Sequence, residues 1–274
     1  METYIGYTDC EVNEEQLANF YENKNSLIPS PIENHYYLLW LNGEIVDKCK
    51  YEKGNFHKVE YNTIKTRQLG TVKPRNIEQE LAIDLLYSRE SKVKLIKGVY
   101  GSGKDYLMLS QALSLIEKGT FQKIVFIRPN VTVANVPEIG YLKGDEREKL
   151  AWTLAPLYDK VGGEEGVLEL MDRGQLESVP LLFLRGRSFE NSIVYVCEGQ
   201  NITTEIAKLI ISRLGEGSEL WINSDTHQVD RKVYEQDNGV NRMIERLQGH
   251  PLFGMVYLPK TERSALAELA TLLD

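Results

Sequence analysis

From residue 76 onward, short apolar runs alternate with stretches in which apolar side chains recur at the spacing of a helix. The apolar runs predict strands at 93–97, 123–127, 192–197, 219–223 and 254–258. The stretches between them predict helices at 77–89 and 104–117, and a helical insertion at 145–172 that Pro156 kinks or splits. This alternation favours a mostly parallel sheet with helices on both faces, in which a ligand binds at the carboxyl ends of the strands.

The first part of the chain has a different pattern. A short helix is expected at 14–24, and small strands are expected to follow it at 36–41, 44–49 and 56–61. The segment Thr63–Arg75 then carries basic residues and no acidic one, which is typical either of a solvated linker or of a nucleic-acid contact. We therefore expect a small β-rich subdomain with one helix at 1–72 and an α/β domain at 73–274.

The whole chain has 274 residues, of which 42% are hydrophobic, and a net charge of −8. An acidic chain does not bind nucleic acid through its overall charge, so such a contact needs a local patch such as Arg185-Gly186-Arg187. No apolar run is long enough for a membrane span and the acidic start lacks an export leader, so we expect a cytoplasmic protein without membrane contact. The three cysteines and four histidines are scattered, which disfavours disulfides and a metal cluster.

The strongest chemical signal follows the strand expected at 93–97. The segment there reads Gly98-Val99-Tyr100-Gly101-Ser102-Gly103-Lys104-Asp105. Glycines permit a compressed turn, the amides of 101–106 can point inward at an anion, and the start of a helix adds its positive dipole end. Lys104 is placed to reach the terminal phosphates of a nucleotide, and only Asp105 departs from the phosphate-loop pattern, which has a magnesium-binding hydroxyl there. A glycine-rich turn without a ligand is the weaker alternative.

A hydrolase built on such a loop needs a base at the end of another strand, and the run 191–201 offers Glu198. Its carboxylate could orient or deprotonate the attacking water. The metal-holding aspartate that usually precedes this base is replaced by Cys197. An exposed strand-end carboxylate without a catalytic role is the alternative interpretation of Glu198.

In order and spacing, these residues resemble the ATPase domain of PhoH proteins, which are P-loop ATPases related to superfamily 1 helicases. The resemblance runs from about residue 73 to residue 274. Beyond the loop and the Glu198 segment, the matching blocks are Asn76 to Gln79, Arg128-Pro129, Gly140 to Asp145, Pro156 to Asp159, Arg185 to Ser188, Ser212 to Gly215, Ser224-Asp225 with Gln228, and Glu262-Arg263-Ser264. The order of the blocks is far more specific than any single block.

The resemblance implies a RecA-like P-loop NTPase fold and an ATPase that uses ATP and Mg²⁺ and couples hydrolysis to the binding or unwinding of single-stranded RNA. The catalytic residues that it implies are Lys104, Glu198, Gln228 and Arg263. The residues that it implies for nucleic-acid or phosphate contacts are Arg128, Arg185 and Arg187. Relatives also imply a homo-oligomeric ring, in which an arginine finger could act across a subunit boundary.

The loop pattern and the resemblance together assign nucleotide binding to Gln79, Gly98, Tyr100, Gly101, Ser102, Gly103, Lys104, Asp105 and Tyr106. In this set Gln79 would read the adenine base. Asn76 and Gln79 could instead form a helix-capping box, so both interpretations of Gln79 stay open.

Asp105 and Cys197 remove both standard magnesium ligands but leave the number of carboxylates unchanged. Our hypothesis is a swap in which Asp105 binds magnesium directly, because a carboxylate oxygen suits magnesium and a helix start favours an anion. The competing hypothesis is a degenerate site that binds nucleotide poorly or hydrolyses it slowly. The alternative function is a nucleotide-regulated binding module, in which ATP occupancy switches contact with a protein partner.

Overall fold

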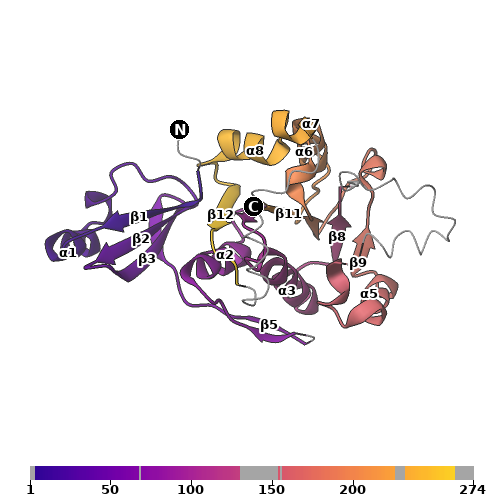
Figure 1. The fold of residues 1–274 in the computed structure, drawn as a ribbon, viewed down its shortest axis with the longest axis horizontal. Helices are drawn as coiled ribbons and strands as arrows, with labels where there is room; N and C mark the ends of the chain where they lie inside the picture. Colours follow the sequence, from indigo (N-terminus) through magenta and orange to yellow (C-terminus); the bar gives the residue numbers. More distant parts are fainter. Residues whose placement is uncertain (1–3, 68, 130–153, 155, 226–231, 263–274) are drawn as a thin grey trace.

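The computed structural model describes residues 4–67, 69–129, 154, 156–225 and 232–262. A six-stranded sheet forms the centre of the molecule (Figure 1). Its strands, in order across the sheet, are β12 (Phe253–Leu258), β7 (Val93–Gly98), β11 (Glu219–Asp225), β10 (Ser192–Val196), β8 (Lys123–Ile127) and β9 (Leu176–Ser178). Every neighbouring pair is parallel, which confirms the expected α/β architecture and is consistent with a P-loop NTPase fold.

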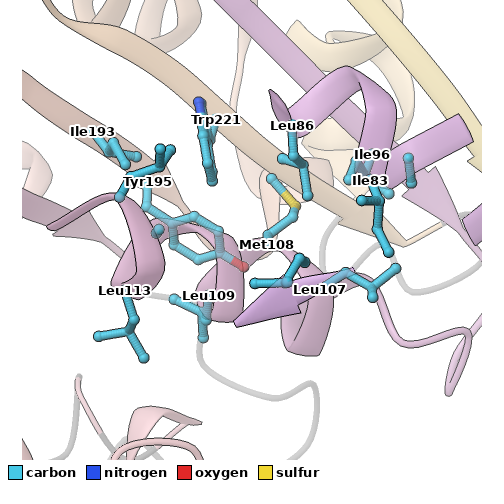
Figure 2. Packing of buried hydrophobic residues seen from close by; sticks show 14 of the residues in the cluster. Ile83, Leu86, Ile96, Leu107, Met108, Leu109, Leu113, Ile193, Tyr195 and Trp221 are labelled. Carbon is cyan, nitrogen blue, oxygen red and sulfur yellow. The ribbon is translucent and has the colours of Figure 1, made fainter. Parts of the chain in front are cut away.

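Helices cover both faces of this sheet. The helices α2 (Ile77–Tyr87) and α3 (Lys104–Glu117) bury their apolar side chains on one face, where Met108 lies near Trp221 of the sheet (Figure 2). The helices α6 (Thr204–Ile211) and α8 (Gly239–Leu247) pack on the other face, in a second hydrophobic cluster. The short helix α7 is Lys232–Gln236, and α5 (Gly163–Asp172) lies beside β9. Burial on both faces explains why the central strands are almost continuously apolar.

Side-chain caps start three of these helices, and at α8 the cap is Asn238, which accepts a hydrogen bond from the Asn241 amide (2.9 Å). Asn76 accepts a hydrogen bond from the Gln79 amide (2.8 Å) at the start of α2, and Thr203 accepts one from the Ile206 amide (3.4 Å) at the start of α6. Each cap satisfies one of the amides that a helix start leaves without an intrahelical partner. Asn76 therefore caps α2, but the reciprocal bond of a capping box is not formed, because Gln79 Oε1 accepts from the Arg75 amide (2.9 Å) instead of the Asn76 amide.

A second sheet contains the N-terminal strands β1 (Tyr7–Glu11), β2 (His35–Leu41), β3 (Glu44–Glu52) and β4 (Asn55–Lys58), in that order. The helix α1 (Glu14–Glu22) packs with it. Tyr36 and Leu38 of β2 join the hydrophobic cluster of α2 and α3, and the Tyr36 hydroxyl donates to Asp84 of α2 (2.9 Å). The N-terminal sheet is therefore packed into the main core.

Two strands lack a clear sequence signal. β1 buries only Tyr7 fully, and β9 has three residues of which Leu176 alone is buried. Such short edge strands show no alternation from which a strand could be predicted. Both take their position from a neighbouring strand, β1 from β2 and β9 from β8.

The basic segment 63–75 is not a solvated linker. It forms a hairpin of β5 (Ile64–Thr66) and β6 (Gly70–Val72) that packs on α3, with Ile64 and Val72 buried in the main core. The Arg67 amide donates to the carboxylate of Glu117 at the end of α3 (3.1 Å). Charge patterning alone could not reveal this, because the two apolar anchors stand isolated among basic residues.

The helical insertion expected at 145–172 lies partly outside the described residues. Residues 156–158 are helical, and a new helix, α5, begins at Gly163. Gly162 and Gly163 both have positive φ values, 85° and 81°. The helical residues described before α5 end at Tyr158, and the two glycines lie at the start of α5, where Gly162 is the N-cap. The expected kink or split at Pro156 involves the residue just before it, which lies outside the described ones. Within the described ranges, no helix is long and apolar enough to cross a membrane.

Candidate functional site

The phosphate loop joins β7 to α3 at the carboxyl edge of the central sheet. Gly101 and Gly103 have φ values of 75° and 86°, a region that favours glycine. Gly103 is the N-cap of α3 and has no side chain with which to cap the first amides of the helix. Those amides lack intrahelical partners and attract anions. The loop thus has the compressed geometry that the sequence predicts for a phosphate cradle.

Ser102 lies in the middle of the loop and is 1% exposed. Among the described residues its hydroxyl has no hydrogen-bond partner. An unpaired buried hydroxyl costs about 1–3 kcal/mol, and an oxyanion bound in the loop would remove that cost. The unpaired hydroxyl is therefore an observation in favour of a bound anion.

Gln79 ties the loop to the start of α2. Its amide Nε2 donates to the Ser102 carbonyl (3.0 Å), and its Oε1 accepts from the Arg75 amide (2.9 Å). Both ends of the side chain are thus engaged within the chain. This arrangement ties the loop to the residue before the N-cap of α2, and adenine contact by Gln79 stays a prediction.

Lys104 is held against the beginning of the loop. Its ammonium donates to the carbonyls of Gly98 (2.9 Å) and Val99 (2.8 Å) and pairs with Asp225 at 3.2 Å. Asp225 is the last residue of β11. All three ammonium protons therefore have acceptors, and a phosphate must replace at least one of them to bind this lysine.

Glu198 lies two residues after the end of β10 and has a φ of 58°, which is unusual for a residue with a side chain. Its amide donates to Asn223 Oδ1 (2.8 Å), and its carboxylate Oε2 accepts from Gln200 Nε2 (2.6 Å). Backbone strain of this kind costs about 1–3 kcal/mol and is concentrated at functional sites. The first bond fixes the backbone of Glu198 and the second fixes its carboxylate, and Glu198 lines a pocket together with the phosphate loop.

Asp105 does not stand alone at the start of α3. Its Oδ1 accepts hydrogen bonds from the Tyr195 hydroxyl of β10 and from Asn223 Nδ2 of β11. Burial, and then the charge of Asp105, raises the pKa of Tyr195 well above its ordinary value. Tyr195 is therefore a permanent hydrogen-bond donor to the carboxylate.

Cys197 occupies the position of the usual metal-holding aspartate. It is buried, and burial followed by the charges of Asp105 and Glu198 raises the pKa of its thiol well above its ordinary value. Because metals bind the thiolate, this thiol is unsuited to hold one. Asn223 Nδ2 lies 4.0 Å from Cys197 Sγ, which accepts a weak hydrogen bond from it.

These elements enclose a pocket of about 410 Å³. Its lining residues are Lys73, Arg75, Gln79, Tyr100, Gly101, Ser102, Gly103, Lys104, Asp105, Tyr106, Leu107, Lys160, Glu198, Asn223, Asp225 and Glu262. The structure thus brings together most of the residues that the sequence assigned to nucleotide binding, and adds Glu198. Gly98 supports the loop from behind, where a Cβ would lie 2.5 Å from the Leu258 carbonyl.

The arginines expected to contact nucleic acid or phosphate lie away from the lining. Arg187 pairs with Glu177 (2.6 Å) and stacks on Phe189, whereas Arg185 is exposed. Arg128 follows β8, close enough to lower the pKa of Cys197 by its charge. Gln228 and Arg263 lie outside the described residues.

Sequence reasoning missed Lys73, Lys160 and the pair Tyr195 and Asn223 as members of the site. Lys73 looked like part of a charged connector, and Lys160 directly follows the block Pro156 to Asp159. Tyr195 looked like one more core residue of an apolar strand. Asn223 had a usable signal, because a run of polar residues there ends an otherwise apolar strand at the ligand-binding edge.

The side chains at the site fit a magnesium ion that takes some of its ligands from the protein and the others from the phosphates of a bound nucleotide. In the part of the chain that the structure describes, no three His, Cys, Asp or Glu side chains are grouped closely enough to hold a metal. Magnesium is commonly held by one or two carboxylates together with substrate phosphates. Asp105 lines the pocket with a carboxylate, and its Oδ2 has no hydrogen-bond partner among the described residues.

Comparison with known proteins gives a consistent result. The chain matches the PhoH-like protein family over residues 71–271. Protein PhoH2 of Thermobispora bispora is 35% identical over 209 residues, which are 75% of this chain and 48% of that protein. Protein PhoH2 of Bacillus subtilis is 30% identical over 287 residues, which are 98% of this chain and 64% of that protein. A PhoH-like protein of Bacillus subtilis is 34% identical over 168 residues, or 60% of this chain and 52% of that protein.

The chain spans between about half and about two thirds of the length of these curated relatives. The family match nevertheless covers most of this chain, from β6 to beyond β12. It includes the phosphate loop, Glu198 and every strand of the parallel sheet. On these grounds the chain belongs to the PhoH family.

Proposed function

We propose that the chain binds ATP in this pocket and hydrolyses it with magnesium, and that hydrolysis is coupled to the binding or unwinding of RNA. PhoH membership indicates a P-loop ATPase-type function. The observation that carries the proposal is the phosphate loop itself. It combines left-handed glycines, an uncapped helix start and an unpaired Ser102 hydroxyl in a pocket lined by Lys104 and Glu198.

Each residue has a role that follows from its place. The amides of 101–106 bind the phosphates, and Lys104 exchanges its carbonyl partners for phosphate oxygens and stabilises the charge that develops in the reaction. Glu198 orients or deprotonates the attacking water. Asp105 binds magnesium, which supplies further charge stabilisation when it is bound. Gln228 as sensor of the γ-phosphate and Arg263 as arginine finger complete the proposal.

The RNA half of the proposal concerns the arginines of the block Arg185 to Ser188. Arg185 is exposed, whereas Arg187 is paired with Glu177, so only Arg185 offers a readily available cation in this block. Assembly into a ring would bring such an arginine to a neighbouring subunit. We also propose 73–274 as the ATPase domain and 1–72 as its appendage, in keeping with a family match that begins at residue 71.

The test is the release of phosphate from ATP with magnesium, measured with and without single-stranded RNA. We expect turnover by the wild-type chain that rises when RNA is added. The matched control is Lys104→Ala, which should remove turnover while the protein stays folded. Turnover that survives in Lys104→Ala would contradict the assignment of the site, and turnover that ignores RNA would contradict the coupling.

The alternative is a nucleotide-regulated binding module. It is favoured by one observation, that Asp105 and Cys197 replace both standard magnesium ligands and Asp105 is engaged by two other side chains. Tight ATP binding without turnover, under conditions in which RNA is also present, would select this alternative over the ATPase.

A further inference from the structure

Three side chains from three different elements meet beside the phosphate loop. Asp105 comes from the first turn of α3, Tyr195 from β10 and Asn223 from β11. Tyr195 is completely buried, and its ring stacks on Phe126 with centroids 5.6 Å apart. Figure 2 shows its side chain extending from the sheet toward α3. The hydroxyl therefore has a fixed position below the loop.

The hydrogen bonds among the three residues all run toward Asp105, which accepts from both of the others. The Tyr195 hydroxyl donates to Asp105 Oδ1 and accepts from Asn223 Nδ2 (2.9 Å), and Asn223 Nδ2 also donates to Asp105 Oδ1. The other end of the amide, Asn223 Oδ1, accepts from the Glu198 amide (2.8 Å). One carboxylate oxygen is thus saturated by protein donors, and the other has no partner among the described residues.

We infer that Tyr195 and Asn223 are positioning residues, which hold Asp105 by Oδ1 so that Oδ2 is presented to a magnesium ion bound with the nucleotide. This inference rests on the proposed function and deepens it. Donors that fix a metal-binding carboxylate typically contribute 10- to 100-fold to metal affinity. Asn223 also joins the carboxylate to the backbone of Glu198, so one side chain orients both acidic residues of the site.

A consequence follows from the charge of Asp105. A carboxylate next to the phosphates repels them unless a cation lies between, whereas the usual hydroxyl at this position does not. Nucleotide and magnesium should therefore bind as a strongly coupled pair. The measurable quantity is the ratio of the nucleotide dissociation constant in excess chelator to that in saturating magnesium.

The experiment measures this ratio with a fluorescent, non-hydrolysable ATP analogue for the wild type, Tyr195→Phe and Tyr36→Phe. Tyr36 is a matched control because it is also buried and its hydroxyl also donates to an aspartate, Asp84, on α2. We expect Tyr195→Phe to lower the ratio about tenfold, through weaker binding in magnesium. Tyr36→Phe should leave the ratio unchanged, even where it lowers thermal stability.

A second variant keeps the inference testable if Tyr195→Phe folds poorly. Asp105→Asn removes the repelling charge, so it should bind the analogue more tightly than the wild type in chelator and bring the ratio close to one. An unchanged ratio in either Tyr195→Phe or Asp105→Asn would overturn the inference while leaving ATP binding intact. No binding by the wild type in either condition would overturn the proposed function and this inference together.

Discussion

The central sheet has an ion pair at the amino ends of its strands, here called the amino edge, and another at their carboxyl ends, here called the carboxyl edge. The two pairs differ in their access to the pocket. At the amino edge, Lys94 of β7 and Glu219 of β11 form an ion pair of 2.9 Å in which neither side chain is exposed. At the carboxyl edge, Lys104 and Asp225 form a pair of 3.2 Å that lines the candidate site. The same two strands position both pairs, because β7 leads into the phosphate loop and β11 ends at Asp225.

The amino-edge pair is surrounded by protein. Lys94 also donates to the carbonyls of Leu86 (3.1 Å) and Ser88 (2.6 Å), and Glu219 accepts from the Trp221 indole (3.0 Å). Burial lowers the pKa of Lys94 to about 8, against the opposing effect of Glu219. At the carboxyl edge a pocket adjoins the pair, so an anion can replace the partners of Lys104. If the proposed function holds, access to a ligand, more than the ion pair itself, separates a structural charge from a functional one.

The largest expected effect comes from Lys94→Met. It removes the nearest cation of the buried Glu219 carboxylate, at 2.9 Å, and leaves only the partly exposed Arg89 (3.3 Å) and Lys92 (3.7 Å) within ion-pair distance among the described residues. The loss of one partner of a buried pair costs up to about 3–5 kcal/mol of unfolding free energy. Urea unfolding measures the loss. The double variant Lys94→Met with Glu219→Leu should recover most of it, because no uncompensated charge remains. A loss below about 1 kcal/mol in the single variant would remove the contrast between the two edges.

Lys104→Met tests the other edge. The proposed role predicts a fall in ATP turnover of about 100- to 1,000-fold, as for the loss of one group that stabilises transition-state charge. The unfolding free energy should fall much less than in Lys94→Met, since Asp225 keeps contact with the pocket. Turnover and urea unfolding are measured on the same preparation. If the stability losses of the two variants were equal, the carboxyl-edge pair would be structural too.

His35 shows what burial does when no opposite charge is present. It lies 3% exposed in β2, with ring nitrogens 2.8 Å from Thr8 Oγ1 and 3.1 Å from the Tyr4 hydroxyl, and burial lowers its pKa to about 4. An unfolded histidine titrates near 6.5, so below that pH the unfolded state binds the extra proton. Burial of neutral His35 therefore costs no unfolding free energy above about pH 6.5. As the pH falls from about 6.5 toward 4, proton uptake by the unfolded state lowers the free energy of unfolding, by about 2–3 kcal/mol at pH 4.5.

The measurement compares urea unfolding of the wild type and His35→Gln at pH 7.5 and pH 4.5. The stability difference between the two proteins should shrink or reverse at the lower pH, because the variant has no group to protonate there. Parallel pH profiles would show that His35 does not titrate in this window.

The smallest effect is expected for Gln79→Leu. Both ends of the Gln79 side chain are engaged, at Ser102 and Arg75, so we expect it to support the loop for any nucleotide. Its loss should weaken ATP and GTP binding by the same factor, about tenfold for hydrogen bonds worth about 1–2 kcal/mol. Calorimetry with both nucleotides gives the two factors. A loss confined to ATP would instead restore the adenine-reading interpretation.

Much of the sheet domain follows from its sequence. The strand at 93–97, the loop and the helix at 104–117 match β7 and α3 closely, because a local apolar run, local glycines and a local helical period define them. The N-terminal sheet is less predictable. Its strand β1 and the hairpin β5–β6 expose much of their surface and depend on partners elsewhere in the chain, so their local patterns resemble loops.

The sequence by itself determined the phosphate loop and its lysine, because these residues are close together along the chain. It also determined the likeness to PhoH proteins, because that likeness depends on short blocks and their order in the chain. Only the tertiary structure decided the partners of Asp105, since Tyr195 and Asn223 are 90 and 118 residues away from it. Those contacts exist because β7, β11 and β10 are adjacent in the sheet. The order of parallel strands is set by long-range packing, and no local pattern of polar and apolar residues encodes it.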